Sequence, residues 1–265
     1  NVMVADTDGN IYYQRTGRVP IRPAGYDFSR PVNGSTSRTA WQGLHKTEDF
    51  VQVLNPSQGY MQNCNITPDV MMVGSPMKKS LYPDYIFNQP EMYTHQHATR
   101  ATEVLHNTEK FSIESFIDLS LDKKCYQAER WIAELQNAHL YNDQFKEPDY
   151  HEGLMQIGLW DGYSRRDSKG AVYYYYWRKN LNELTERDHM RDMTDRVNNY
   201  LDIFGVEDDS DAEDSLLNAE ERELLLDALE KAMAEIREKH GTLDIVFGDV
   251  FRAGRLDYDG DNVSY

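Results

Sequence analysis

Uncharged amide side chains gather in one short stretch of the chain. The run Asn55-Pro56-Ser57-Gln58-Gly59-Tyr60-Met61-Gln62-Asn63-Cys64-Asn65 combines a proline turn with a glycine at which the backbone can change direction. An amide NH2 donates a hydrogen bond without carrying a charge, so it can stabilise a developing oxyanion without holding a product carboxylate too tightly. The run is therefore a candidate site for cleavage of an amide bond.

Several short motifs occur in order around this run. They are Asp6-Thr7-Asp8-Gly9-Asn10-Ile11-Tyr12-Tyr13, Thr16-Gly17-Arg18-Val19-Pro20, Trp41-Gln42-Gly43, Asn55-Pro56-x-x-Gly59-Tyr60 and Asn63-Cys64-Asn65-x-x-Pro68. Each means little alone, but the ordered set resembles the penicillin acylase family, whose members are amidohydrolases with an N-terminal nucleophile. A weaker likeness continues through His97-Ala98-Thr99-Arg100 to Phe247-Gly248-Asp249-Val250 and stops at Asp257-Tyr258-Asp259-Gly260-Asp261.

The resemblance implies catalytic roles for two residues. Asn65 takes the place of the family's side-chain oxyanion donor, and Arg100 takes that of a charged residue that supports the active-site network. Simpler interpretations stay open: Asn65 as a turn or strand-edge amide, and Arg100 as the ion-pair partner of Glu103 at helical spacing. We expect the Asn65 amide to face the cleft that the nucleophile occupies.

The resemblance also implies a nucleophile that is the first residue of a processed subunit and uses its own α-amine as base. Residue 1 is an asparagine, which is not a nucleophile, and it matches family sequence downstream of the catalytic serine. We therefore expect an internal segment of the β subunit that is inactive alone. Its partners would be the upstream nucleophile-bearing sequence and the α subunit of the same precursor.

The expected substrates are N-acylated amines, such as N-acyl homoserine lactones and β-lactam side chains, hydrolysed through an acyl-enzyme. Because the family's acyl pocket is built largely from upstream residues, this segment does not identify the substrate or the substrate-binding residues. The alternative from another class is a non-catalytic binding or structural protein that keeps the acylase scaffold. The resemblance implies a periplasmic or secreted protein, although residues 1–5 lack the basic start and the apolar stretch of a signal peptide.

No cofactor for catalysis is implied, but the resemblance suggests a structural calcium ion. Its candidate ligands are the backbone carbonyl of Phe28 and the carboxylate of Asp84, with the remaining ligands expected upstream. An EF-hand is excluded, because the loop that begins at Asp6 has glycines at its fourth and twelfth positions, Gly9 and Gly17. His95-Gln96-His97 is too short a pattern to assign a pair of metal ligands.

Composition argues against several kinds of partner. The chain has 45 acidic and 28 basic side chains and a formal net charge of −17, which disfavours nucleic acid and anionic membranes. No apolar run approaches the roughly 18 residues of a membrane span, so we expect no membrane insertion.

The two thiols, Cys64 and Cys125, are too few for a disulfide framework and wrongly spaced for zinc, and are expected to be separate and buried.

The sequence predicts an α+β fold. Residues 1–66 are predicted to form strands and loops, with a hairpin of residues 2–5 and 11–16 followed by an irregular loop from 17 to 43. The resemblance implies that they are part of the β-sandwich of an N-terminal-nucleophile (Ntn) hydrolase. Residues 67–265 are predicted to be a mostly helical region of the same β subunit, ending before the family's closing strands.

Periodic apolar residues and capping residues predict individual helices. One helix has Cys125, Ala128, Ile132, Leu135 and Ala138 on one face; another has Leu225, Ala228, Leu229, Ala232, Met233 and Ile236. The second has Asn218 and Glu221 as a capping box and Gly241 as its stop. A third begins after Asp167 or Ser168 and contains Tyr173-Tyr174-Tyr175-Tyr176-Trp177, which cannot all face one side. For these aromatic residues we favour core packing over an acyl-chain pocket.

Overall fold

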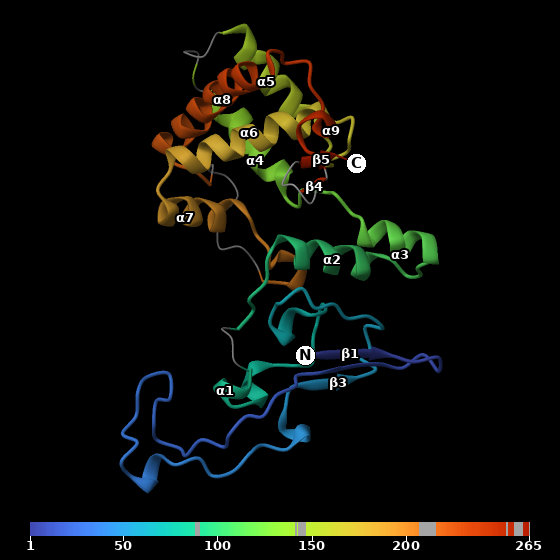
Figure 1. Ribbon diagram of the computed structural model, residues 1–265, viewed down its shortest axis with the longest axis vertical. Coiled ribbons are helices and arrows are strands. Elements are labelled where there is room, and N and C mark those ends of the chain that lie inside the picture. The colour runs from blue at the N-terminus through green and yellow to red at the C-terminus, as the bar shows by residue number, and fades with distance from the viewer. Residues whose placement is uncertain are drawn as a thin grey trace. The chain divides into compact units, whose positions relative to one another are not determined.

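A computed structural model describes residues 1–87, 91–140, 142, 147–206 and 216–252, together with the backbone of two short strands at 254–256 and 262–264. The chain divides into two compact units: unit 1 holds residues 1–112 and 200–206, and unit 2 holds residues 113–199 and 207–265 (Figure 1). The predicted change from strands and loops to helices at residues 66 and 67 lies within unit 1 and stays a prediction. The stretch 257–261, where the family likeness was predicted to stop, lies outside the described residues.

Unit 1 contains a three-stranded antiparallel sheet in the order β1-β2-β3. The strands are β1 (Val2–Ala5), β2 (Ile11–Gln14) and β3 (Gln52–Leu54). The connection between β1 and β2 is held by Asp6, whose Oδ1 accepts hydrogen bonds from the backbone N–H groups of Asp8 and Asn10, at 3.0 and 2.8 Å. The predicted hairpin is therefore confirmed. In the described part of unit 1 no second sheet packs on this one, so the β-sandwich stays a prediction.

Around the sheet, unit 1 is mostly loop. The predicted excursion from residue 17 to residue 43 folds back on itself through backbone bonds from Ile21 N to Gly43 O, at 3.0 Å, and from Gln42 N to Ile21 O, at 2.9 Å. Two helices follow, α1 (Asp84–Phe87) and α2 (Gln96–Asn107). The core of this unit comprises Tyr13, Phe50, Val51, Ile66, Val70, Met71, Met72, Met77, Ile86, Phe87 and Ala98.

Unit 2 is helical, as predicted for this part of the chain. Its helices are α3 (Ile113–Ser120), α4 (Ala128–Leu140), α5 (Pro148–Gly158), α6 (Lys169–Leu184), α7 (Arg187–Val197), α8 (Ala219–His240) and α9 (Phe247–Val250). The strands β4 (Gly254–Leu256) and β5 (Asn262–Ser264) pair antiparallel. Helices α4, α5, α6 and α8 pack on one another, and α6 contributes buried residues on most of its circumference.

The tyrosine run lies on α6 and divides between core and surface, as the sequence required. Tyr173, Tyr174, Tyr176 and Trp177 are buried, whereas Tyr175 is 44% exposed. The buried polar tips find partners: Tyr173 donates from its hydroxyl to the carbonyl of Leu243 at 2.7 Å, and Trp177 donates from Nε1 to the carbonyl of Leu225 at 2.9 Å. Large aromatic side chains can therefore fill the centre of unit 2 without leaving these polar groups unsatisfied.

The predicted helix ends are also observed. Asn218 accepts a hydrogen bond from the backbone N–H of Glu221, whose carboxylate accepts one from the backbone of Asn218, and Gly241 ends α8 in the left-handed conformation at φ 69°. At the start of α6, Ser168 accepts from the backbone N–H of Ala171 at 3.1 Å. The predicted face of α4 is buried, but Cys125 lies before its first residue.

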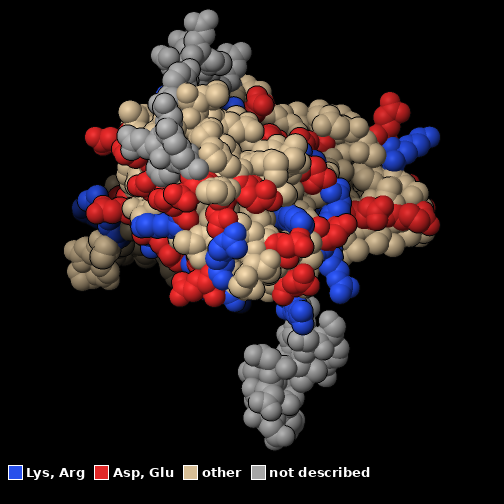
Figure 2. Space-filling view, turned by 90° about the horizontal axis from the view of Figure 1, so that it is seen from above, with Lys and Arg blue, Asp and Glu red and all other residues tan. Residues whose placement is uncertain are grey.

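Surface charges of both signs are interspersed over the face shown in Figure 2. Ion pairs also join helices of unit 2, such as that of Lys179 of α6 with Glu235 of α8 at 2.8 Å. Among the described helices, none combines the length with the apolar composition that crossing a bilayer requires.

Candidate active site

Asn65 lies in an exposed turn of unit 1, and its side chain is open to solvent. Its backbone is in the left-handed conformation at φ 60°, which asparagine tolerates better than most residues. The side chain of Asn63 accepts a hydrogen bond from the backbone N–H of Asn65 at 2.9 Å, which stabilises the turn locally. The backbone is thus held while the Asn65 amide extends from the surface, where it can donate to a bound group.

This turn is tied to the segment that leads into α2. His95 Nε2 lies 2.8 Å from the carbonyl oxygen of Cys64, and the backbone N–H of Thr67 donates to the carbonyl of Tyr93 at 3.1 Å. A third link is buried: Gln62 donates from Nε2 to the hydroxyl of Thr102, within α2, at 3.0 Å. The turn that carries Asn65 is therefore joined on its N-terminal side to α2, which carries Arg100, and on both sides to the segment just before α2.

Arg100 lies in the second turn of α2, with 18% of its side chain exposed. Its guanidinium pairs with Glu103, the partner that helical spacing suggested. Among the interactions between described residues, no hydrogen bond joins Arg100 to the side chain of Asn65. The structure therefore brings the turn and the helix together through His95, Gln62 and Thr67, and the catalytic roles of Asn65 and Arg100 stay predictions.

The Asn-Pro motif before this turn has a structural role. Asn55, at φ 48°, accepts a hydrogen bond on Oδ1 from the backbone N–H of Ile11 at 2.9 Å and donates from Nδ2 to Asn10 Oδ1 at 2.8 Å. Further along, Tyr60 accepts from the backbone N–H of Val73 at 3.1 Å. Burial raises the pKa of the Tyr60 hydroxyl, so it is a neutral hydrogen-bonding group at neutral pH.

The two candidate calcium ligands do not form a site by themselves. The carboxylate of Asp84 is 90% exposed and lies 3.7 Å from the ammonium of Lys79, and the ring of Phe28 packs against Tyr26 and Arg22. Calcium takes six to eight oxygen ligands. Since the described residues hold no group of three or more His, Cys, Asp or Glu suited to a metal, Asp84 and Phe28 do not fit a calcium ion without further ligands.

The thiols are separate, but only half-buried instead of fully buried. Burial raises the pKa of both Cys64 and Cys125, which keeps them protonated and weakly nucleophilic.

The role of His95, Gln62 and Thr102 in holding the turn of Asn65 was not predicted from the sequence. The sequence suggested for His95 and His97 only a pattern too short to assign as metal ligands; their rings are in contact, with centroids 5.9 Å apart. However, His95 Nε2 is occupied by its hydrogen bond to the Cys64 carbonyl oxygen. The position of His95 immediately before α2 was the one signal that pointed to a structural role.

Comparison with known proteins identifies a family to which the chain is similar. The sequence profile of the family described as Penicillin amidase matches residues 1–256. One stretch of 68 residues, 26% of this chain and 8% of the relative, is 43% identical to penicillin G acylase of Escherichia coli. The solved structure of thermostable penicillin G acylase from Alcaligenes faecalis matches 91% of this chain at 18% identity and a TM-score of 0.52.

At 18% identity, the match to the solved structure shows only that the two folds are similar. This chain covers 47% of the length of that structure. The match to the family profile, in contrast, runs along nearly the whole chain and ends at residue 256, next to the predicted end of the likeness at Asp257. The chain therefore belongs to the penicillin amidase family.

Proposed function

We propose that this chain is part of an amidohydrolase that cleaves N-acylated amines through an acyl-enzyme, with Asn65 as the side-chain donor to the oxyanion. The observation that carries the proposal is the placement of Asn65: an exposed amide on a turn that hydrogen bonds fix at both ends. An oxyanion donor must be held in position before the reaction, because reorganising it would cost part of the stabilisation it provides. The family match supports the same reaction type.

The nucleophile and part of the sheet are proposed to come from other sequence of the same precursor. Strand β1 lies at the edge of the sheet and exposes three apolar side chains, with Val2, Met3 and Val4 between 44% and 52% exposed. An exposed apolar edge strand readily pairs with or packs against another segment. Further strands of an Ntn-hydrolase sandwich, carrying the nucleophile, would cover it. Arg100 would then act beside the nucleophile as a supporting charge.

The proposed substrates remain N-acyl homoserine lactones, β-lactam side chains and similar N-acylated amines, and the proposed location is periplasmic or secreted. A calcium ion at Asp84 and Phe28 is part of the proposal only with ligands from the same additional sequence, which would supply the remaining oxygen atoms.

The test is turnover of an N-acylated 4-nitroaniline by the intact precursor after processing, compared with the 265-residue chain alone. We expect release of nitroaniline by the processed protein and none by the chain alone, because the chain alone lacks the nucleophile. Turnover by the chain alone, after contaminants are excluded, would contradict the proposed division of the active site. A processed protein that folds but releases no nitroaniline from a panel of acyl groups would favour the non-catalytic scaffold instead.

A further inference from the structure

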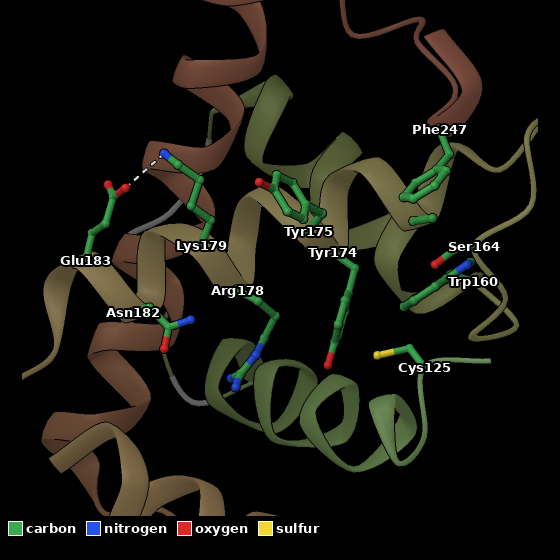
Figure 3. Close-up of a pocket in the computed structure, with 11 residues that line it drawn as sticks. Cys125, Trp160, Ser164, Tyr174, Tyr175, Arg178, Lys179, Asn182, Glu183 and Phe247 are labelled. Atoms are coloured by element: carbon green, nitrogen blue, oxygen red, sulfur yellow. Dashed lines mark ion pairs between the residues drawn. The ribbon is translucent and has the colours of Figure 1, made fainter. Parts of the chain in front are cut away.

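A pocket of about 590 Å³ lies along one side of α6 and is formed entirely by residues of unit 2. Figure 3 shows aromatic side chains at one end of it and charged and amide side chains at the other. The aromatic end is lined by Trp160, Tyr174, Tyr175 and Phe247. Small-molecule sites typically measure about 300–1,000 Å³, so the pocket has room for a ligand of two fused rings.

Backbone hydrogen bonds fix the segments that wall this pocket. On one side, residues 123–125 and 162–164 pair through backbone bonds of 2.7 and 3.0 Å. On the other side, the backbone N–H of Phe247 donates to the carbonyl of Ser168, the N-cap of α6, at 2.9 Å. The pocket therefore exists before a ligand enters, and binding costs little ordering of the chain.

The rings at the aromatic end are also fixed. Trp160 and Tyr174 have ring centroids 4.8 Å apart, and Trp160 donates from Nε1 to the carbonyl of Tyr163 at 2.9 Å, which sets the orientation of the indole. Phe247 packs on Phe251 with centroids 4.5 Å apart. Aromatic rings attract one another through their faces and edges beyond the apolar area that they bury. A flat aromatic ligand gains these contacts, and a saturated ring of the same size does not.

The charged side chains lie at the other end of the pocket and are engaged with protein groups. Lys179 pairs with Glu183 at 3.0 Å and with Glu235 at 2.8 Å, so two carboxylates offset its charge. The guanidinium carbon of Arg178 lies 3.5 Å from the ring centroid of Trp131. A neutral ligand at the aromatic end makes no demand on any of these charges.

One neutral polar side chain lies at the aromatic end. Ser164 is half-buried and lines the pocket, and Figure 3 shows it beside Trp160. Within the described parts of the chain, no group makes a hydrogen bond to its hydroxyl. A serine hydroxyl can both donate and accept, so it can bind a hydroxyl or an N–H group of a ligand. The nearby Cys125 thiol adds no charge, because burial raises its pKa.

We propose that this pocket binds a neutral aromatic compound that carries a hydroxyl or N–H group. The ring would pack among Trp160, Tyr174 and Phe247, and the polar group would bind the hydroxyl of Ser164. The rings then supply most of the affinity, and the serine sets the orientation of the ligand. Binding requires neither turnover nor the proposed active site.

The experiment compares 2-naphthol with decahydro-2-naphthol, which has the same hydroxyl on saturated rings, by titration of the 265-residue chain in nuclear magnetic resonance. We expect 2-naphthol to bind about threefold to tenfold more tightly, because only its rings gain aromatic contacts. It should shift the indole N–H resonance of Trp160, which is identified by its absence in Trp160→Phe. Equal affinities, no binding of 2-naphthol at millimolar concentration, or shifts confined to other tryptophans would overturn the proposal.

A serine variant tests the polar contact with a third probe, naphthalene, which lacks the hydroxyl. Ser164→Ala should weaken the binding of 2-naphthol by about threefold to tenfold and that of naphthalene by less than about twofold, as the loss of one neutral hydrogen bond predicts. The matched control is Ser120→Ala on α3, outside the pocket, which should change neither affinity. Equal changes for both probes in Ser164→Ala would refute the role of Ser164.

A phenylalanine variant tests the ring contacts. Phe247→Ala should weaken 2-naphthol and naphthalene alike, because both lose the same wall of the pocket. Unchanged affinities in folded Phe247→Ala would place the ligand elsewhere and contradict the proposal. Should Phe247→Ala not fold, as judged by circular dichroism, the comparison of 2-naphthol with decahydro-2-naphthol and the Ser164→Ala variant decide the matter.

Discussion

His95 and Cys64, 31 residues apart, are joined by a hydrogen bond of 2.8 Å between the imidazole Nε2 and the Cys64 carbonyl oxygen. A carbonyl oxygen can only accept, so Nε2 must carry the hydrogen. The bond fixes the residue before Asn65 to the residue before α2. An exposed turn is thereby given a defined position, which a hydrogen-bond donor to an oxyanion requires.

Replacing His95 by leucine should therefore loosen the turn. We expect His95→Leu to lower the free energy of unfolding by about 1 kcal/mol, the typical net worth of one such bond. In the intact enzyme it should lower kcat more than it raises KM. Chemical denaturation and steady-state kinetics measure the two effects. His95→Gln, whose amide can still donate to the carbonyl, is the control and should recover part of both; equal behaviour of the two variants would show that the bond is unimportant.

Asn65→Ala in the intact, processed enzyme should lower kcat by about 10²–10³ with a much smaller change in KM. The reason is that an oxyanion donor binds charge that exists only in the tetrahedral transition state. Steady-state kinetics on a chromogenic amide measures both constants.

The backbone of Asn65 calls for a second variant. At φ 60°, alanine adds a strain of roughly 1–2 kcal/mol that glycine does not. Asn65→Gly removes the amide but relieves the backbone. If the amide is the donor, both variants lose the same activity; if Asn65 serves only as a turn residue, Asn65→Gly keeps near-normal kcat and the proposed catalytic role is wrong.

Much of the local structure was predictable because its causes lie within a few residues. The capping box of Asn218 and Glu221, the stop at Gly241 and the Asp6 turn each depend on contacts at short sequence separation. The division of the tyrosine run followed from geometry alone, since 3.6 residues per turn cannot place four consecutive side chains on one face.

Long-range relationships were not predictable in the same way. Nothing in the local pattern indicates that His95 meets Cys64, that Gln62 meets Thr102, or that residues 200–206 return to unit 1. A pocket at the tyrosine run was only the less favoured alternative to core packing. Trp160 and Phe247, which line the pocket beside α6 together with Tyr174, are distant in sequence, and only the packing of α6 brings them together. Apolar periodicity shows which face is buried, but not what that face contacts.

Glu221 should make the stability of unit 2 depend on acid pH. Its burial would raise its pKa, but hydrogen bonds from Arg196, the Asn218 backbone and His189 outweigh burial and lower the pKa to about 2, from a usual value of 4.5. A carboxyl whose folded pKa is depressed stabilises the fold above its unfolded pKa, and that contribution is lost as the pH falls from about 4.5 towards 2. We expect a loss of up to about 3 kcal/mol across this window, measured by urea unfolding at a series of pH values.

Glu221→Gln should be less stable at pH 7 and should show a flatter dependence on pH in the same window. Glu223, on the exposed side of the same helix, provides the control: Glu223→Gln should leave the pH dependence unchanged. An unaltered slope in Glu221→Gln would show that other carboxyl groups cause the acid sensitivity.

Gly170 allows α6 to begin directly against the end of α5. A Cβ atom on Gly170 would lie 2.5 Å from the Cβ of Trp160 and 2.8 Å from the backbone carbonyl oxygen of Gln156, closer than atoms can approach. Alanine favours helix by about 1 kcal/mol over glycine, but overpacking a close contact costs about 1–3 kcal/mol, so the clash should prevail. We expect Gly170→Ala to lower the free energy of unfolding of unit 2 by about 1–2 kcal/mol in chemical denaturation.

Gly34→Ala is the matched control, because no atom lies within 4 Å of its added Cβ, and its free energy of unfolding should stay within about 0.5 kcal/mol of that of the unaltered chain. Unchanged stability in Gly170→Ala would mean that α5 and α6 are not packed as closely as the structure shows.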